Sequence, residues 1–370
     1  MKLSQLRSVV VLIFAATFLP LVLSAQAPAR KGLTWMLTGE MNENAFYHTA
    51  NLLQNGMVLV TSGTDMVTGR LPVGQLYDPA SGSWSSTGTC LARIFHTGTL
   101  LHNGKVMVAG GSIDDAFPQV TPGVQLYEPS TNTWTSTSDM LTERENHSAV
   151  LLGSGDVLVA GGKDDAGHDL ATAELFHPAG QFGSWSATGS MQTGRSFFQL
   201  TLLSDGRVLA SGGQNGSTYV SDVEIYDPAT GTWTVTGSLL IGRYSHTATL
   251  LPSGQVLVAG GLGQSPRVLA EAELYDPATG VWTATTPLNF ARDGHRATLL
   301  AGRVIVTGGA PPNVANGWEM YDPGTATWKF GRLNGSHSGH TATLLRDQTI
   351  LVAGGNTHTE LSAEIGAITH

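Results

Sequence analysis

The sequence is poor in cysteine and in charged residues. Cys90 is the only cysteine among 370 residues, so no disulfide can form within the chain. Charged residues make up 13% of the sequence, whereas 46 residues are glycine. This composition argues against long, solvated helices and favours short strands joined by tight turns. We therefore expect an all-β fold.

Basic residues and catalytic motifs are also scarce. The chain has 19 Lys and Arg against 28 Asp and Glu, a net charge of −9. Nucleic-acid binding requires a concentrated basic surface, so we expect no nucleic-acid partner. The sequence contains no Gly-x-Ser-x-Gly elbow, no phosphate-binding Gly-Lys-Ser/Thr loop and no His-Glu-x-x-His motif. We accordingly predict no catalytic residue, no metal ligand and no cofactor.

The one long apolar run lies at the N-terminus. Lys2 and Arg7 precede an apolar stretch at residues 8–23, and small residues follow it. This order is typical of a secretory signal peptide, with cleavage expected after Ala25 or Ala27. Residues 1–27 are thus predicted to be removed, which gives a secreted or periplasmic protein without a membrane span. The alternative is a retained anchor, because the run is close to the minimum spanning length of roughly 17 residues.

One unit of 46 to 51 residues recurs through the rest of the chain, residues 28–370. Most copies have a strand-like segment containing His, a turn with Gly, an apolar segment such as Val-Leu-Val-Ala, a Gly doublet, then a Tyr and a Trp. In the first copy the doublet is Ser62-Gly63, and in the third copy Phe176 replaces the Tyr. The second Gly of the doublet falls at Gly63, Gly111, Gly162, Gly213, Gly261, Gly309 and Gly355. The alternating first segment, the fully apolar second one and the Asp-Pro-Ala-Thr-Gly turns predict a blade of four antiparallel strands.

The order of these landmarks resembles the kelch repeat, whose units form β-propellers. The resemblance spans the mature chain and implies a single seven-bladed propeller. The last copy lacks a fourth strand, whereas the segment Trp35 to Gly39 matches a fourth strand without a blade of its own. We predict that this N-terminal strand completes blade seven and closes the ring.

Histidine recurs in the first strand of six copies, and Phe198 replaces it in the remaining one. Two interpretations are open. The imidazoles can face the central channel and bind a metal or an anion, or each can be a packing residue satisfied by backbone or by a neighbouring blade. The six histidines are His48, His96, His147, His246, His295 and His340.

Arginine lies three residues before the strand-one position in five copies. In a four-stranded blade, this connection and the loop after strand two emerge on the same face, so the arginines are expected on the loop-rich face. The kelch resemblance implies that arginines at this position surround the channel mouth and hold acidic groups, for which a planar guanidinium is suited. The alternative is pairing within the protein. The predicted ligand-binding residues are Arg93, Arg144, Arg195, Arg243 and Arg292.

The segment beginning Tyr47-His48 is also similar to the Tyr-His pair in the propeller of galactose oxidase, a copper enzyme. That resemblance would further require a tyrosine cross-linked to cysteine and a second histidine from a C-terminal domain, and Cys90 does not match the family's position. We therefore expect a non-catalytic scaffold that binds a protein, peptide or glycan. The alternative is a copper-dependent oxidase or another carbohydrate-active enzyme.

Overall fold

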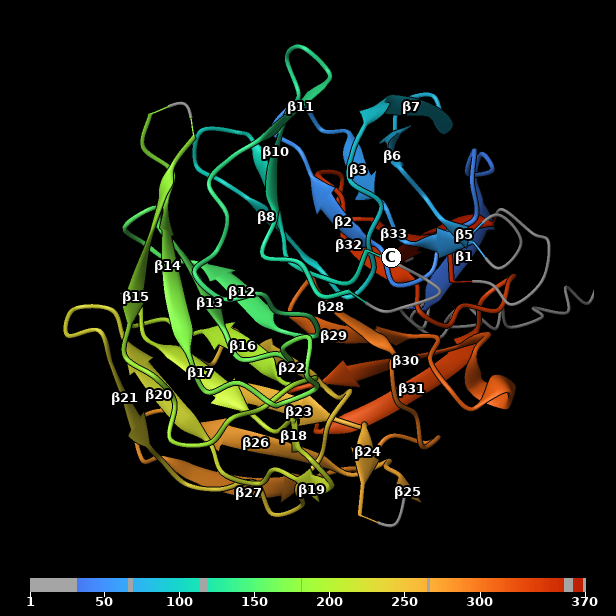
Figure 1. Cartoon of the computed structure of the whole chain (residues 1–370). Helices are drawn as coiled ribbons and strands as arrows, with labels where there is room; N and C mark the ends of the chain where they lie inside the picture. Colours follow the sequence, from blue (N-terminus) through green and yellow to red (C-terminus); the bar gives the residue numbers. More distant parts are fainter. Residues whose placement is uncertain are drawn as a thin grey trace, which may run out of the picture.

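The computed structural model describes residues 32–65, 69–113, 119–180, 182–264, 267–355 and 362–368. These residues form seven four-stranded antiparallel sheets arranged around a common axis (Figure 1). Within these ranges there is no α-helix, and so none that could cross a membrane. The all-β, seven-bladed propeller predicted from the repeat is confirmed. The predicted signal peptide lies outside the described residues.

The first four blades follow one another along the chain, each from the innermost strand outward. Blade one contains β2 (Thr49–Leu52), β3 (Val58–Thr61), β6 (Val73–Asp78) and β7 (Ser83–Thr89). Blade two contains β8 (Thr97–Leu100), β9 (Val106–Ala109), β10 (Val124–Glu128) and β11 (Thr133–Ser136). Blade three contains β12 (Ser148–Leu151), β13 (Val157–Ala160), β14 (Ala173–His177) and β15 (Ser184–Thr188). Blade four contains β16 (Gln199–Leu202), β17 (Val208–Ser211), β20 (Glu224–Asp227) and β21 (Thr232–Val235).

The remaining blades repeat this order, and blade seven takes its outer strand from the N-terminus. Blade five contains β22 (Thr247–Leu250), β23 (Val256–Ala259), β26 (Ala272–Asp276) and β27 (Val281–Thr285). Blade six contains β28 (Arg296–Leu300), β29 (Arg303–Thr307), β30 (Gly317–Asp322) and β31 (Thr327–Arg332). Blade seven contains β32 (Thr341–Leu344), β33 (Ile350–Ala353), β34 (Ala363–Ile368) and β1 (Leu33–Leu37).

Short elements follow strand two in several blades. Two-residue hairpins are formed by β4 (Thr64–Asp65) with β5 (Gly69–Arg70), by β18 (Gln214–Asn215) with β19 (Thr218–Tyr219), and by β24 (Leu262–Gly263) with β25 (Arg267–Val268). Blade six instead has a single 3₁₀ turn, η1 (Pro312–Val314). These loops differ between blades, whereas the four-stranded frame does not.

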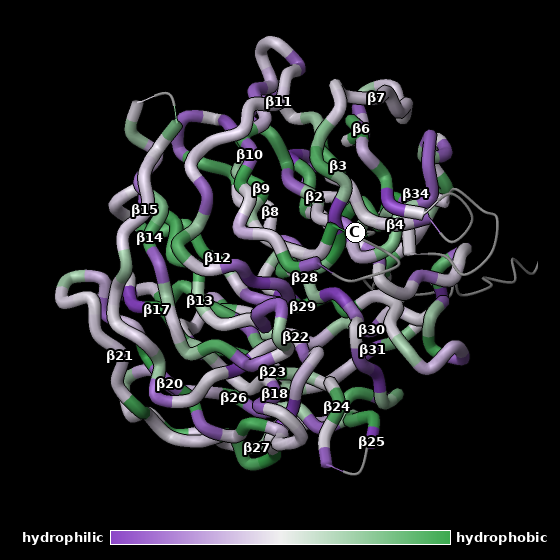
Figure 2. The backbone as a smooth tube through the Cα atoms, viewed as in Figure 1, coloured by the Kyte–Doolittle hydropathy of each residue, from purple (hydrophilic) through white to green (hydrophobic). Residues whose placement is uncertain are grey.

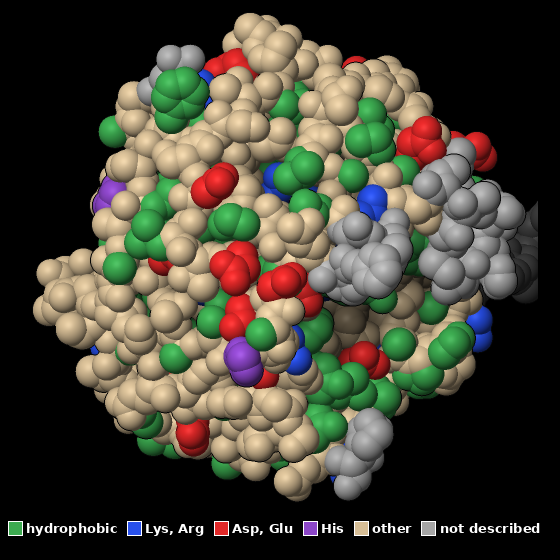
Figure 3. All heavy atoms as spheres, in the orientation of Figure 1, with side chains coloured by type: hydrophobic (Ala, Val, Ile, Leu, Met, Phe, Trp, Pro, Cys, Tyr) green, Lys and Arg blue, Asp and Glu red, His purple; other side chains and the backbone are tan. Residues whose placement is uncertain are grey.

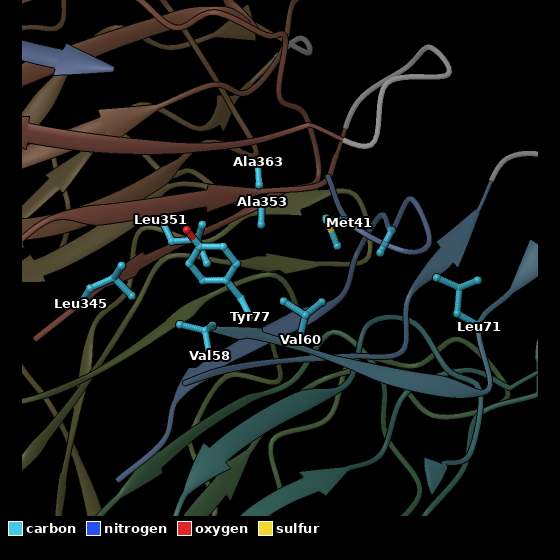
Figure 4. Close-up of a cluster of buried hydrophobic side chains, with 10 residues drawn as sticks. Met41, Val58, Val60, Leu71, Tyr77, Leu345, Leu351, Ala353 and Ala363 are labelled. Atoms are coloured by element: carbon cyan, nitrogen blue, oxygen red, sulfur yellow. The ribbon is translucent and has the colours of Figure 1, made fainter. Parts of the chain in front are cut away.

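The ring closes as the sequence predicted. Strand β1 pairs antiparallel with β34, with Trp35 opposite Gly366. The absence of a side chain at Gly366 is required here, because a Cβ atom would lie 2.6 Å from the Trp35 indole. A cluster of buried side chains at the seam joins blade one to blade seven, and Figure 4 shows Val58 and Tyr77 close to Leu351 within it. Pairing and packing therefore both hold the two ends of the chain together.

The core lies between adjacent blades. The four residues Val-Leu-Val-Ala of strand two are fully buried in blades three and five, and the equivalent segments are buried in the other blades as well. Such a strand is covered on both faces by neighbouring sheets, which explains why it is apolar throughout (Figure 2). Stability therefore comes from a series of similar interfaces between blades.

The repeated Tyr and Trp join each blade to the one before it. In blade five, Tyr275 packs against Trp282 with ring centroids 4.9 Å apart. The Trp282 indole N–H donates to the carbonyl of Gly237 in blade four at 2.8 Å. Gly237 approaches the next blade so closely that a Cβ atom there would lie 2.1 Å from the carbonyl oxygen of Gly280. The glycine four residues after Trp233 is therefore fixed by this contact.

The first strands of successive blades are neighbours around the axis. Strands β2, β8, β12, β16, β22, β28 and β32 form this inner ring. Isolated β-bridges join the connection before strand one to the loop after strand two, as between Ser196 and Gln214 and between Tyr244 and Leu262. The expectation that these two segments share one face is confirmed.

Candidate functional site

The five arginines predicted to bind a ligand are buried in the structure. Arg93, Arg144, Arg195, Arg243 and Arg292 each have a relative accessibility of 0%. They do lie in the connection before strand one, as expected, but their side chains point into the blade. A ligand at the surface has no part of these guanidinium groups to contact. Their expected exposure at the channel mouth is therefore wrong.

Each buried guanidinium binds groups of its own blade. Nη1 of Arg243 donates to the carbonyls of Gly260 and Glu271 at 2.9 and 2.7 Å. Nη2 of Arg243 pairs with Oε1 of Glu273 at 2.6 Å. Glu273 also accepts the backbone N–H groups of two residues in the connection before strand one. The ion pair thus fastens this connection to strand three and to the loop after strand two.

The same ion pair between arginine and glutamate occurs in blades three to six, whereas blades two and seven have other residues. The other three pairs are Arg144 with Glu174, Arg195 with Glu224, and Arg292 with Glu319. In blade seven, His337 replaces the arginine and bonds to Glu364 at 3.1 Å.

In blade two, Gln125 stands where the glutamate would be. Burial lowers the pKa of Arg93 to about 10, and the Nε and Nη2 atoms of Arg93 have no hydrogen-bond partner among the described residues. Reading arginine and glutamate together along the repeat would have identified these pairs from the sequence, since a glutamate two residues before the repeat Tyr or Phe accompanies the arginine in four copies.

The strand-one histidines join neighbouring blades. Nε2 of His147 bonds to the hydroxyl of Thr97 in blade two at 2.9 Å, and Nε2 of His295 bonds to Thr247 in blade five at 3.0 Å. All six are buried, and burial lowers the pKa of His147 and His246 to about 3. Of the two interpretations of these histidines, the geometry supports packing and not a ring of ligands in the channel.

The residues directly before the strand-one positions form a second ring, here called the mouth ring. Its members are Tyr47, Phe95, Asn146, Phe197, Ser245, Gly294 and Gly339, and all seven have a positive φ, between 52° and 69°. Backbone hydrogen bonds join five of the seven neighbouring pairs, including Phe197 N–H to Asn146 O at 3.0 Å and Gly294 N–H to Ser245 O at 3.0 Å. The ring fixes the backbone, while its side chains differ from blade to blade.

Aromatic side chains of the mouth ring and its neighbours form an arc. Tyr47 contacts Phe95 with centroids 4.9 Å apart, Phe95 contacts Phe197 at 6.5 Å, and Phe197 contacts Tyr244 at 5.9 Å. Tyr219, on the β18–β19 hairpin, continues the arc at 5.5 Å from Tyr244. Tyr47 is 48% exposed and the other four rings are partly exposed. The sequence does not predict this arc, because its residues share no motif and meet only in the closed ring of blades.

A cavity lies beside the far end of this arc. It has a volume of about 320 Å³ and is lined by residues of the β18–β19 hairpin and its flanks, among them Thr193, Asn215, Tyr219 and Asp222. In the view of Figure 3, acidic side chains gather near the middle of the molecule and few basic ones are visible there. This surface suits a ligand with an apolar ring or face better than a polyanion.

The residues of the predicted copper alternative do not fit a copper site. Among the described residues, no group of three or more His, Cys, Asp or Glu is arranged to hold a metal ion. His48 is 3% exposed and its Nε2 bonds to the hydroxyl of Thr341 at 2.9 Å, whereas the adjacent Tyr47 is exposed. Cys90 is buried, and burial raises the pKa of its thiol to about 11. Cys90 is therefore an inert, buried thiol.

Comparisons with known proteins agree with this architecture. A search of curated protein sequences gave no match. Among solved structures, a fungal alcohol oxidase of the AA5 family, in complex with copper, is similar with a TM-score of 0.72 and 18% identity, covering 90% of this chain and 76% of that one. This confirms the resemblance to galactose oxidase at the level of the fold. Residues 95–309, more than half of the chain, match the family model described as the KLHDC2/KLHL20/DRC7 Kelch-repeats domain. The chain therefore belongs to the kelch-repeat family of β-propellers.

Proposed function

We propose that this protein is a non-catalytic binding scaffold that recognises a protein, peptide or glycan at the mouth ring of its loop-rich face. The observation that carries this proposal is the identity of the residues in the ring. A positive φ favours glycine and is costly for bulky residues. Even so, Tyr47, Phe95 and Phe197 occupy three such positions, at φ values of 55°, 58° and 54°. Their rings add little to the core, because they remain partly exposed.

Backbone strain of this kind, of order 1–3 kcal/mol per residue, is found mainly where function requires a particular side chain. Aromatic residues supply large, rigid contact surfaces and are enriched at binding sites. The mouth ring combines both features with a fixed backbone, which lowers the entropy lost on binding. The buried arginines, predicted from the sequence to bind a ligand, support this site only indirectly. They hold in place the connections before strand one, which carry the mouth ring.

The test uses arrays of glycans and peptides probed with the purified protein and with the double variant Phe95→Gly/Phe197→Gly. Glycine relieves the positive φ, so the variant keeps its fold while losing the two rings. We expect the variant to bind the ligands of the natural protein with an affinity at least about tenfold lower. Ala326→Gly is the matched control, since Ala326 also has a positive φ (50°) but lies in the β30–β31 turn. Ligands retained in full by the double variant would place the binding site elsewhere.

We also propose that the protein acts after export, as its N-terminal sequence indicates. Mass spectrometry of the protein from its native host should then find a mature chain that begins at residue 26 or 28. Recovery of the full-length chain with Met1 from the membrane fraction would instead support the retained anchor.

A further inference from the structure

Two residues of the inner ring depart from the repeat. The residue after the strand-one His or Phe is a small hydroxyl residue in five blades: Thr49, Thr97, Ser148, Thr247 and Thr341. Four of these five, all but Ser148, bond to the histidine of the next blade. Blade four has Gln199 at this position, and blade six has Arg296. Neither long side chain can make the same short contact.

Another residue takes over the missing bond in both blades. In blade six, Thr307 is paired with Arg296 across β28 and β29, and its hydroxyl bonds to Nε2 of His340 at 2.9 Å. In blade four, Ser211 is paired with Gln199 and bonds to His246 at 3.4 Å. Four other blades have alanine at the position of Thr307, namely Ala109, Ala160, Ala259 and Ala353. Arg296 is thus released from the structural role that its position has elsewhere.

The released guanidinium lies at the inner edge of blades six, seven and one. Nε of Arg296 donates to the carbonyl of His340 at 2.9 Å. Burial lowers the pKa of His48 to about 3, and the charge of Arg296 adds to this effect, so the guanidinium also lies close to blade one. Burial lowers the pKa of Arg296, and the interaction with Tyr47, the first member of the aromatic arc, offsets part of this effect. Unlike the five buried arginines, Arg296 is partly exposed and forms no ion pair with a described carboxylate.

The mouth ring leaves space beside this cation. Gly294 belongs to the same connection as Arg296, and a Cβ atom built on it would meet no atom within 4 Å. A Cβ atom on Gly339 would lie 3.4 Å from the ring of Tyr47. The ring is therefore open at Gly294, whereas Gly339 lies directly against the ring of Tyr47. A ligand there can contact a cation and an aromatic face together.

We propose that the mouth ring beside Gly294 binds a sugar residue carrying one carboxylate, with Arg296 bonding the carboxylate and Tyr47 and Phe95 packing on the sugar's apolar face. The inference rests on the proposed binding function. A guanidinium holds a carboxylate through two parallel hydrogen bonds, and an aromatic face suits the C–H surface of a pyranose. A strongly anionic ligand fits poorly, because the net charge of the protein is −9.

The backbone of the ring favours a sugar over an extended peptide. A peptide that adds to a sheet edge needs free N–H and C=O groups. In the mouth ring such groups are used between neighbours in five of the seven adjacent pairs, as in the bond from Tyr47 N–H to Gly339 O at 3.0 Å. Recognition at this point therefore depends on side chains, which suits a compact ring-shaped ligand.

The experiment is isothermal titration calorimetry of the full propeller with glucuronate, glucose and N-acetylglycine. We expect glucuronate to bind at least about tenfold more tightly than either control, since only glucuronate combines a pyranose with a carboxylate. Arg296→Thr restores the residue found in four other blades, so it should keep the fold and lose this preference. Gln199→Thr makes the corresponding change in blade four, and this variant should retain the preference for glucuronate.

Other results would contradict parts of the proposed sugar site. Equal binding of glucuronate and glucose, or an unchanged preference in Arg296→Thr, contradicts the role of Arg296. Binding of N-acetylglycine as tight as that of glucuronate contradicts a sugar ligand and favours a peptide end. If no carboxylated sugar binds but array ligands are lost in Phe95→Gly/Phe197→Gly, this inference is wrong and the proposed function stands. If array ligands are also insensitive to that variant, both fail.

Discussion

Two residues of one connection in blade four have opposite surroundings. Arg195 has no exposed surface and bonds to Glu224 and to three backbone carbonyls. Phe197, two positions later, is partly exposed at a positive φ of 54° and contacts other aromatic rings. The arginine recurs in five blades, whereas the residue at the position of Phe197 varies. In this propeller, the polar residue that repeats builds the frame, whereas the position that varies is partly exposed on a fixed backbone.

The largest effect on stability is expected when one of the repeated arginines is removed. Arg243→Met leaves Glu273 buried without its partner, and such a change typically costs about 3–5 kcal/mol of unfolding free energy. Urea unfolding measures the loss. Arg207→Ala is the matched control, because its pair with Asp205 is exposed and should cost less than about 1 kcal/mol. Equal effects of the two changes would remove the structural role of the buried arginines and reopen their role in binding.

The buried histidines predict a loss of stability in acid. The pKa of His147 falls from 6.5 to about 3 on folding, because burial disfavours the charged ring. As the pH falls below 6.5, the unfolded chain therefore takes up a proton that the folded chain does not, and stability decreases until about pH 3. At about pH 5 this amounts to about 2 kcal/mol for one histidine.

The substitution that tests this prediction is His147→Phe, which copies Phe198 of blade four. Urea unfolding of the natural protein and the variant at pH 7 and pH 5 should show that the variant loses about 2 kcal/mol less between the two values. An identical pH dependence in the two proteins would mean that His147 does not resist protonation in the folded state.

In blade two, where Gln125 stands in place of the repeated glutamate, we expect a substitution that raises the unfolding free energy. Gln125 accepts the backbone N–H of Leu91 at 2.7 Å, but Arg93 has no carboxylate such as Glu174 provides for Arg144. Gln125→Glu should complete the pair and raise the unfolding free energy by about 1–3 kcal/mol. The reverse change, Glu174→Gln, should lower it in blade three. Destabilisation by Gln125→Glu would show that the pairs do not stabilise the blades.

The smallest effect on stability is expected at the mouth ring. Phe197→Gly removes a partly exposed ring and relieves a positive φ, so the two contributions should nearly cancel, to within about 1 kcal/mol. Differential scanning calorimetry measures the change. A loss as large as that of Arg243→Met would show that the aromatic arc is part of the frame.

The sequence alone predicted most of the frame. The period, the split seventh blade and the shared face followed from the Gly doublets, from Trp35 and from the alternation of strands. The environment of the arginines did not follow, because their sequence position is the same whether the guanidinium turns outward or into the blade. The aromatic arc brings together residues from four blades, and only the closed ring places them in contact. The different role of Arg296 could not be predicted from the sequence, because it depends on the hydrogen bond that Thr307 makes to His340 in its place.

The most direct test of the division between frame and mouth is a thermal-shift measurement on the natural protein and Arg296→Thr, with and without glucuronate. Without ligand, the two proteins should melt at the same temperature to within a few degrees, because threonine restores the repeat. With ligand, only the natural protein should melt at a higher temperature, as expected for a ligand that binds the folded state. A variant that melts far below the natural protein, or an equal rise in both, would contradict the account.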